Sequence, residues 1–150
     1  MSQRVLFVEP NTKIAANLLA AGRAVGTMDH HVAFETARAT LTARPFDFVV
    51  TNLRLSDFNG LHLVHLVSGN LRPPRCIVYT DTRDAALARE VQRSGAFYET
   101  AECLPVTLAA YLQGALPASD RRNPGLTDRR GSFRGGRRCW DDYIAQHQAV

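Results

Sequence analysis

Short apolar runs alternate with stretches of helical periodicity over roughly the first 116 residues of this chain. Continuous apolar runs are typical of strands buried on both faces, and helices of about ten residues between them link parallel strands. Right-handed crossovers then favour a three-layer, doubly wound α/β sandwich. The expected strands are residues 4–8, 27–33, 48–51, 76–80 and 96–99, and the expected helices are 12–25, 34–43, 60–70, 84–94 and 104–116.

The third apolar run ends in an unusual residue, Asn52, and the polar loop that follows closes at Gly60. In an open parallel sheet, ligand and catalytic groups collect outside the carboxyl ends of the strands. Asn52 therefore lies where chemistry is expected, although an amide is a poor nucleophile and a weak ligand for hard cations. Asp57, five residues later, is interpreted as a solvated loop carboxylate.

The composition changes abruptly at Pro117. Residues 1–117 carry 11 basic and 10 acidic side chains, whereas residues 118–150 carry seven arginines against four aspartates. A segment so poor in large apolar residues buries too little surface to repay its ordering entropy. The sequence predicts one domain over residues 1–117 and an Arg-rich flexible tail over 118–150, with a short amphipathic helix at 140–150.

Several function classes are disfavoured. No apolar run approaches the roughly 20 residues of a membrane span, and the N-terminus lacks a signal-peptide pattern, so a cytoplasmic protein is expected. A Gly-rich phosphate loop and a nucleophile–base spacing are both missing, which argues against an enzyme. His30, His31, His62 and His65 have no cysteine or acid at ligand spacing, so we expect neither a metal site nor a cofactor.

Five landmarks occur in order: an acidic turn after the first strand, the block FDFVVTNLRLSDFNG, Thr80 closing the fourth strand, Ser-Gly-Ala at 94–96 and the alternating pattern itself. Together they resemble the receiver domain of response regulators, the CheY-like family, over about residues 3–116. The resemblance implies a flavodoxin-like (βα)5 fold with strand order 2-1-3-4-5. It also implies a place in two-component, or phosphorelay, signalling in bacteria.

The departures from this family concern its reactive groups. Receivers hold Mg²⁺ with two acids after the first strand and a phosphoacceptor Asp, and a Lys after the fifth strand pairs with the phosphoryl group. Here Glu9 keeps the first acid, Pro10 replaces the second and Asn52 stands at the acceptor position. The Lys position falls on Glu102 or Leu104, and only Thr80 is retained. The resemblance therefore implies a degenerate pseudo-receiver that is not phosphorylated and binds no Mg²⁺.

Such a module is expected to act through protein–protein interaction, with a histidine kinase, another response regulator or a downstream effector as partner. By resemblance, the face made by helix 4, strand 5 and helix 5 mediates docking or a homodimer, and here it includes Tyr98 and Tyr111. Without a phosphoryl group to sense, Thr80 and Tyr98 or Phe97 are expected to keep one arrangement. A second interaction element is the terminal apolar stripe, which would dock on this domain or on a partner: Trp140, Tyr143, Ile144 and His147.

The Arg-rich tail has three interpretations: a linker, a phosphate-binding segment for nucleic acid, or a membrane-attracted segment. Arginines give bidentate phosphate contacts whose affinity falls steeply with salt. However, Phe133 is the single aromatic residue between Arg121 and Arg138, no helix-turn-helix pattern follows the domain, and no lipidation motif is present. The alternative function, a nucleic-acid-associated regulator, would use Arg121, Arg122, Arg129, Arg130, Arg134, Arg137 and Arg138.

Overall fold

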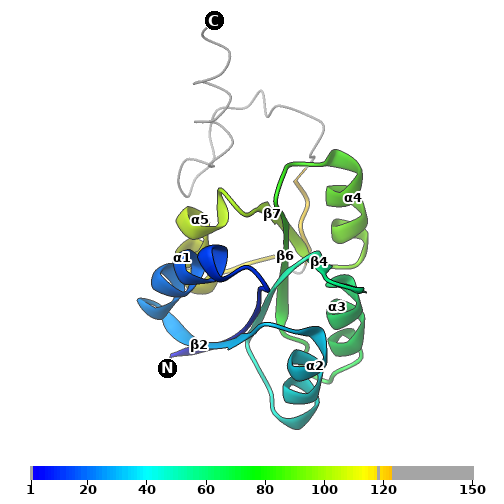
Figure 1. Cartoon of the computed structure of the whole chain (residues 1–150). Helices are drawn as coiled ribbons and strands as arrows, with labels where there is room; N and C mark the ends of the chain where they lie inside the picture. The colour runs from blue at the N-terminus through cyan, green and yellow to red at the C-terminus, as the bar shows by residue number, and fades with distance from the viewer. Residues whose placement is uncertain (1, 118, 123–150) are drawn as a thin grey trace, which may run out of the picture.

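A computed structural model describes residues 2–117 and 119–122 of the chain (Figure 1). Five parallel strands form one sheet in the order β2-β1-β3-β6-β7. These strands are β1 (Gln3–Val8), β2 (Gly26–His31), β3 (Phe48–Asn52), β6 (Arg75–Thr80) and β7 (Phe97–Thr100). The helices are α1 (Thr12–Arg23), α2 (Phe34–Ala43), α3 (Leu61–Ser68), α4 (Ala85–Arg93) and α5 (Leu104–Gln113).

The helices cover both faces of the sheet, which gives the three layers expected from the sequence (Figure 1). Along β1, Leu6 and Val8 belong to the core beneath α2, α3 and α4. Val5 and Phe7 belong to the core beneath α1 and α5. Successive strand residues point to opposite faces. Because both faces are covered by helices, residues 5–8 are all buried, and they form an unbroken apolar run in the sequence.

A small hairpin was not expected. β4 (Arg54–Leu55) and β5 (Phe58–Asn59) pair as a separate antiparallel ribbon within the loop after β3. Its turn holds Ser56 at φ 55°, a conformation uncommon for residues other than glycine. Because the hairpin strands are labelled β4 and β5, the fourth and fifth strands of the parallel sheet are labelled β6 and β7. Counted over these five strands alone, the order is 2-1-3-4-5.

Local sequence signals set the helix ends. The side chains of Asn11 and Asp84 accept hydrogen bonds from the first-turn amides of α1 and α4, which satisfies N–H groups that lack helical partners. Gly95 follows α4 with φ 85°, the left-handed conformation that glycine adopts without strain. The sequence pattern places Leu63, Leu66 and Val67 on one side of the third helix, and for Leu66 that prediction is wrong. Leu66 is 40% exposed, and α3 instead buries Leu61, Leu63, Val64 and Val67.

The domain extends past the expected boundary at residue 117. Asp120 is buried, and its carboxylate and the Arg122 side chain both contact β7. The prediction of a flexible tail from residue 118 is therefore wrong for residues 119–122, because paired charges hold them on the sheet edge. The possible terminal helix at 140–150 lies outside the described residues.

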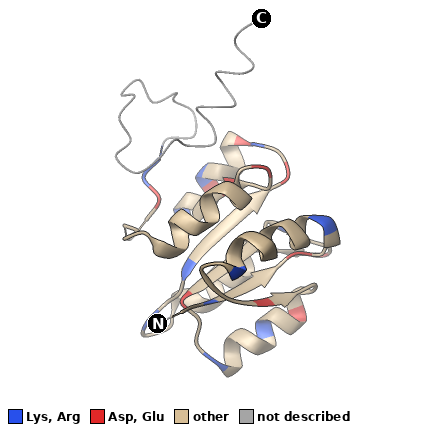
Figure 2. Ribbon diagram, turned by 90° about the vertical axis from the view of Figure 1, so that its left-hand side faces the viewer, with Lys and Arg blue, Asp and Glu red and all other residues tan. Residues whose placement is uncertain are grey.

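Charged residues are interspersed over the described ribbon, with blue and red segments on several helices and loops (Figure 2). Among the described residues, no helix is long and apolar enough to cross a membrane.

Candidate functional site

Asn52 ends β3 and is buried at the carboxyl edge of the sheet, as its position in the sequence predicts. The turn that holds it depends on Gly60, whose amide donates to the Leu53 carbonyl. A Cβ at Gly60 would lie 2.3 Å from the Asn52 carbonyl oxygen and 3.0 Å from Thr51 Oγ1. The glycine is therefore needed for the close approach of the loop to the strand end.

The Asn52 amide nitrogen lies between two carboxylates. Nδ2 donates to Glu9 Oε2 at 3.1 Å and to Asp81 Oδ1 at 3.4 Å. The amide oxygen accepts from the backbone N–H of Arg54 at 3.0 Å. The opposite amide orientation would turn an oxygen toward both acids and an NH₂ group toward the Arg54 N–H, so the surroundings fix the orientation.

Glu9 is 2% exposed and its carboxylate has protein donors on both oxygens. Oε1 accepts from the Asn11 backbone N–H at 2.8 Å, and Oε2 accepts from Asn52 and from the Tyr79 hydroxyl. Burial, followed by the hydrogen bond to Glu9, raises the pKa of Tyr79, so this phenol remains a donor to the carboxylate. The Glu9 carboxylate is thus satisfied by hydrogen bonds from residues of its own fold.

These residues do not fit Mg²⁺, the ion that the receiver family holds at this edge. Mg²⁺ requires several oxygen ligands in near-octahedral geometry, whereas Asn52 presents N–H donors toward Glu9 and Asp81. Pro10 supplies no side-chain ligand. Within residues 2–117 and 119–122, no group of three or more His, Cys, Asp or Glu side chains is arranged to hold a metal ion.

Neither residue at the expected Lys position supplies a cation. Leu104 opens α5 and is fully buried in the core beneath α1 and α5. Glu102 is exposed in the turn before that helix.

Thr80 is joined to Tyr98 through a chain of hydrogen bonds. Thr80 Oγ1 donates to the Thr82 carbonyl at 2.6 Å and lies 2.6 Å from the Tyr98 hydroxyl. Because the Thr80 proton is committed, Tyr98 donates to Thr80, and its oxygen accepts from the Asp84 N–H at 3.0 Å. Of the two aromatic residues considered from the sequence, Tyr98 rather than Phe97 is therefore the one linked to Thr80. Its hydroxyl is hydrogen-bonded to both Thr80 and the Asp84 amide.

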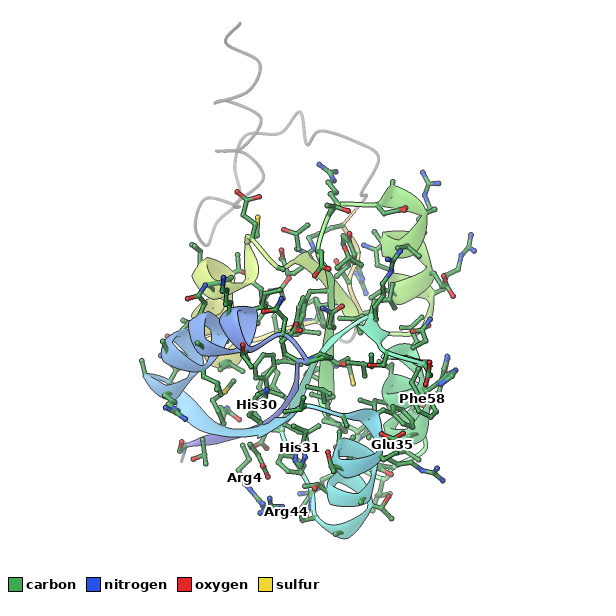
Figure 3. All side chains as sticks on the ribbon, in the orientation of Figure 1. Arg4, His30, His31, Glu35, Arg44 and Phe58 are labelled. Atoms are coloured by element: carbon green, nitrogen blue, oxygen red, sulfur yellow. The ribbon has the colours of Figure 1, made fainter. Side chains whose placement is uncertain are left out.

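His30 and His31 lie on β2 (Figure 3), and each has a contact within the protein. His30 Nε2 lies 3.0 Å from the Glu9 carbonyl oxygen, and the ring stacks on Phe7. His31 Nε2 lies 3.3 Å from Asp29 Oδ1, which is within ion-pair distance but outside hydrogen-bond geometry. His30 therefore contacts the backbone of Glu9 and not its carboxylate.

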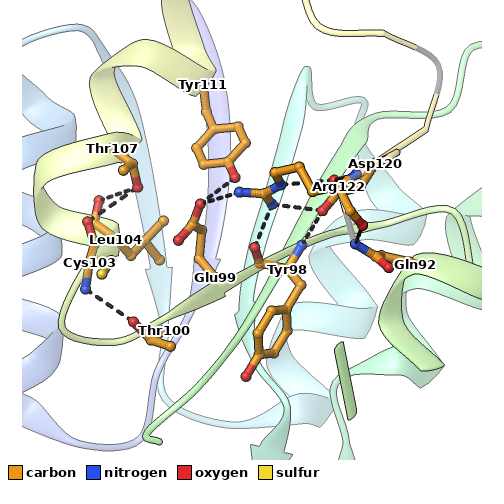
Figure 4. Close-up of polar contacts among 10 residues, drawn as sticks. All are labelled: Gln92, Tyr98, Glu99, Thr100, Cys103, Leu104, Thr107, Tyr111, Asp120 and Arg122. Atoms are coloured by element: carbon orange, nitrogen blue, oxygen red, sulfur yellow. Dashed lines mark hydrogen bonds and ion pairs between the residues drawn. The ribbon is translucent and has the colours of Figure 1, made fainter. Parts of the chain in front are cut away.

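A second buried cluster surrounds Arg122 (Figure 4). Its guanidinium donates to both Asp120 oxygens at 2.8 and 2.7 Å, to Glu99 Oε1 at 2.8 Å and to the Tyr98 carbonyl at 2.6 Å. Tyr111 donates to the same Glu99 oxygen at 2.6 Å. Burial alone would lower the pKa of Arg122, but its hydrogen bonds and ion pairs with Asp120 and Glu99 outweigh this and raise it.

Three predicted roles change with this cluster. Tyr98 and Tyr111 are 2% and 8% exposed, so the prediction that their side chains form an exposed interaction surface is wrong: their hydroxyls are used inside the fold. Arg122 was a candidate nucleic-acid contact, but its guanidinium is occupied by two carboxylates.

Arg121 is exposed. The remaining predicted positions lie outside the described residues: Arg129, Arg130, Arg134, Arg137, Arg138, Trp140, Tyr143, Ile144 and His147.

Sequence reasoning missed Asp81, Tyr79, Glu99 and Asp120. Asp81 directly follows Thr80 at a strand end, so its place at the carboxyl edge was a usable signal. Tyr79, Glu99 and Asp120 had no such signal. Tyr79 and Glu99 are strand residues whose partners come from other elements, and Asp120 lay in a segment too polar to suggest burial.

Comparison of the sequence with protein-family models and with curated proteins gives no match. Solved structures do match. The chemotaxis response regulator CheY4 of Vibrio cholerae is 18% identical with a TM-score of 0.65, and the match covers 75% of this chain and 98% of that one. A CheY-like response regulator receiver domain from Methylobacillus flagellatus is 22% identical with a TM-score of 0.65 and the same coverage.

A third match is a response regulator from Burkholderia pseudomallei, whose structure has a phosphorylated aspartic acid, a calcium ion and citrate. It is 23% identical with a TM-score of 0.64, and the match covers 75% of this chain and 67% of that one. At these identities the likeness concerns the fold. With its five-stranded parallel sheet and five helices, the chain has the fold of CheY-like response-regulator receiver domains.

Proposed function

We propose that this chain is a degenerate receiver of two-component signalling that is not phosphorylated, has no catalytic activity and acts through protein contacts. The observation that carries the proposal is the Asn52 amide, whose N–H groups lie between Glu9 and Asp81. A receiver needs a carboxylate nucleophile at this position to form an acyl phosphate. An amide nitrogen that is already donating two hydrogen bonds offers no such group.

The surrounding charges support the same proposal. Transfer of a phosphoryl group to this edge would place its negative charge beside Glu9 and Asp81, where stabilisation depends on cations. Pro10 stands where the family has an acid, and Glu102 or Leu104 stands where it has a lysine, so neither place supplies a positive charge. The described donors to the Glu9 carboxylate are the neutral groups of Asn11, Asn52 and Tyr79.

The arrangement of Thr80 and Tyr98 supports action in a single state. In receivers these positions report phosphorylation, and here the Tyr98 hydroxyl is held by Thr80 and by the Asp84 amide. A histidine kinase, another response regulator or a downstream effector would then meet one constant surface.

The test is phosphorylation of the purified chain by acetyl phosphate with Mg²⁺, read by intact mass, with an ordinary receiver that has an Asp at this position as control. We expect the control to gain a phosphoryl group and this chain to gain none. A stable, site-specific phosphoryl adduct, or a Mg²⁺-dependent spectral change with beryllofluoride, would contradict the proposal.

A further inference from the structure

Residues 119–122, which we term the clip, cover the outer edge of β7. β7 is the last strand of the sheet, so the outward backbone groups of Tyr98 have no strand partner. The Tyr98 N–H donates to Asp120 Oδ2 at 3.2 Å, and its carbonyl accepts from Arg122 Nη2 at 2.6 Å. Two side chains therefore take the place that a sixth strand would fill.

The clip also contacts both helices that flank β7 (Figure 4). Gln92 of α4 donates to the Arg122 carbonyl at 2.8 Å. On the other side, Arg122 pairs with Glu99, and its guanidinium carbon lies 5.9 Å from the centre of the Tyr111 ring of α5. The clip thus occupies the α4–β7–α5 face through all three of its elements.

These contacts form a site with defined chemistry. It offers one backbone donor and one backbone acceptor on Tyr98, a buried carboxylate on Glu99 and an amide on Gln92. An arginine satisfies the acceptors, and an acid two residues earlier meets the donor while it holds the guanidinium in place. Glu99 Oε2 is buried without a hydrogen-bond partner among the described residues, so the clip does not saturate the site.

We propose that the clip is an intramolecular ligand of a peptide-binding site on the α4–β7–α5 face, and that this site takes segments of the form Asp-x-Arg. A partner that presents such a segment would bind the α4–β7–α5 face by displacing residues 119–122. This proposal uses the proposed function only in treating the face as a docking surface. It does not involve Asn52, so phosphorylation of the chain would leave it standing.

The site also reaches the phosphoacceptor edge through a single residue. The clip binds the backbone of Tyr98, while the Tyr98 hydroxyl binds Thr80 and the Asp84 amide. Replacement of the clip by a partner segment would therefore act on Tyr98, whose hydroxyl is linked to Thr80.

The first experiment compares the full chain with the double variant Asp120→Asn, Arg122→Gln by amide hydrogen exchange. Arg121→Gln is the matched control, because Arg121 is the exposed residue of the clip between Asp120 and Arg122, and its replacement also removes one basic side chain. We expect the Tyr98 amide to exchange at least about tenfold faster in the double variant, since loss of one charge-assisted hydrogen bond is worth more than a factor of ten. The control should match the wild type.

The second experiment adds a synthetic peptide of residues 117–124 to the double variant. The peptide should restore Tyr98 protection, and a peptide in which Asp120 and Arg122 are exchanged should not. Unchanged Tyr98 exchange in the double variant, or no response of a folded double variant to the peptide, overturns the proposal.

If the double variant fails to fold, Arg122→Lys decides the question, since it keeps the charge but loses the planar fork. Faster Tyr98 exchange in Arg122→Lys supports the proposal, and wild-type exchange overturns it.

Discussion

Asn52 gives this pocket something that a carboxylate cannot give, a pair of N–H donors on one atom. Those donors lie at 3.1 and 3.4 Å from oxygens of Glu9 and Asp81. In receivers a divalent cation balances the acids at this edge. Here a neutral side chain of the protein itself links Glu9 and Asp81.

Replacement of Asn52 by Asp is expected to destabilise the domain by about 3 kcal/mol at pH 7, because it removes the donors and places a second buried carboxylate beside Glu9. Mg²⁺ should recover part of this loss in the variant, where the new carboxylate lies beside those of Glu9 and Asp81, and should not affect the wild type. Urea unfolding with and without Mg²⁺ measures each effect.

The matched control is Asn59→Asp, because Asn59 uses its oxygen as an acceptor for the Leu61 amide and a carboxylate keeps that bond. It should leave the free energy of unfolding close to that of the wild type. Equal stability of both variants at pH 7 would contradict the role given to the Asn52 amide.

Gly60 is expected to tolerate no side chain. Gly60→Ala places a Cβ 2.3 Å from the Asn52 carbonyl oxygen and should cost about 1–3 kcal/mol or more, as overpacking does. Gly69→Ala is the control, because nothing lies within 4 Å of a Cβ there and its φ of −84° suits alanine. Chemical denaturation should show a loss in the first variant and a neutral or slightly stabilising effect in the second.

β7 and α4 are linked by the Tyr98 hydroxyl, which accepts from the amide of Asp84, the residue that caps α4. This bond ties the start of the helix to the edge strand. The helix itself is short, so its N-terminal turn depends on such contacts more than on helix propensity.

Tyr98→Phe should therefore lower stability by about 1–2 kcal/mol and speed hydrogen exchange at the Asp84 amide, because it removes the acceptor of that N–H. Thr80→Ser retains a hydroxyl and should leave exchange at Asp84 near the wild-type rate. Similar exchange at Asp84 in Tyr98→Phe and the wild type would show that the tyrosine does not anchor the helix.

The stability of the entire domain should respond to acid through Asp120. Burial alone would raise the pKa of this carboxyl, but the hydrogen bonds and ion pair with Arg122, and the bond from the Tyr98 amide, lower it. A lowered pKa in the folded state means that the stabilisation is complete above the unfolded value of 3.8 and is lost as the pH falls through the folded value.

Asp120→Asn should accordingly be less stable than the wild type at neutral pH, and the difference should narrow as the pH falls below 3.8. Glu99, Tyr111 and Arg122 share the cluster and remain in both proteins, so the comparison isolates one carboxyl. Urea unfolding across this pH range provides the measurement. A difference that does not change with pH would contradict an ionised, paired Asp120.

The alternation of apolar runs and helical patterns was enough to place the three layers and to put Asn52 at the carboxyl edge. Those features depend on which residues are apolar and how often they recur, and both are local properties. The β4–β5 hairpin escaped notice because its two-residue strands show too little alternation. The inward prediction for Leu66 was wrong because α3 is short and five of its eight residues are Leu or Val, so the pattern did not fix which of them is exposed.

The amino-acid sequence alone shows Pro10, Asn52 and the absence of a lysine at position 102 or 104. It also shows that these positions lie at or after strand ends, at the carboxyl edge of the sheet. It does not show the polar partnerships. Asn52 contacts Glu9 and Asp81 across 43 and 29 residues of chain, and Arg122 reaches Glu99 across 23. Burial patterns specify which face a residue takes, whereas a hydrogen bond needs two particular atoms within about 3 Å, and only the folded arrangement of distant segments brings those atoms together.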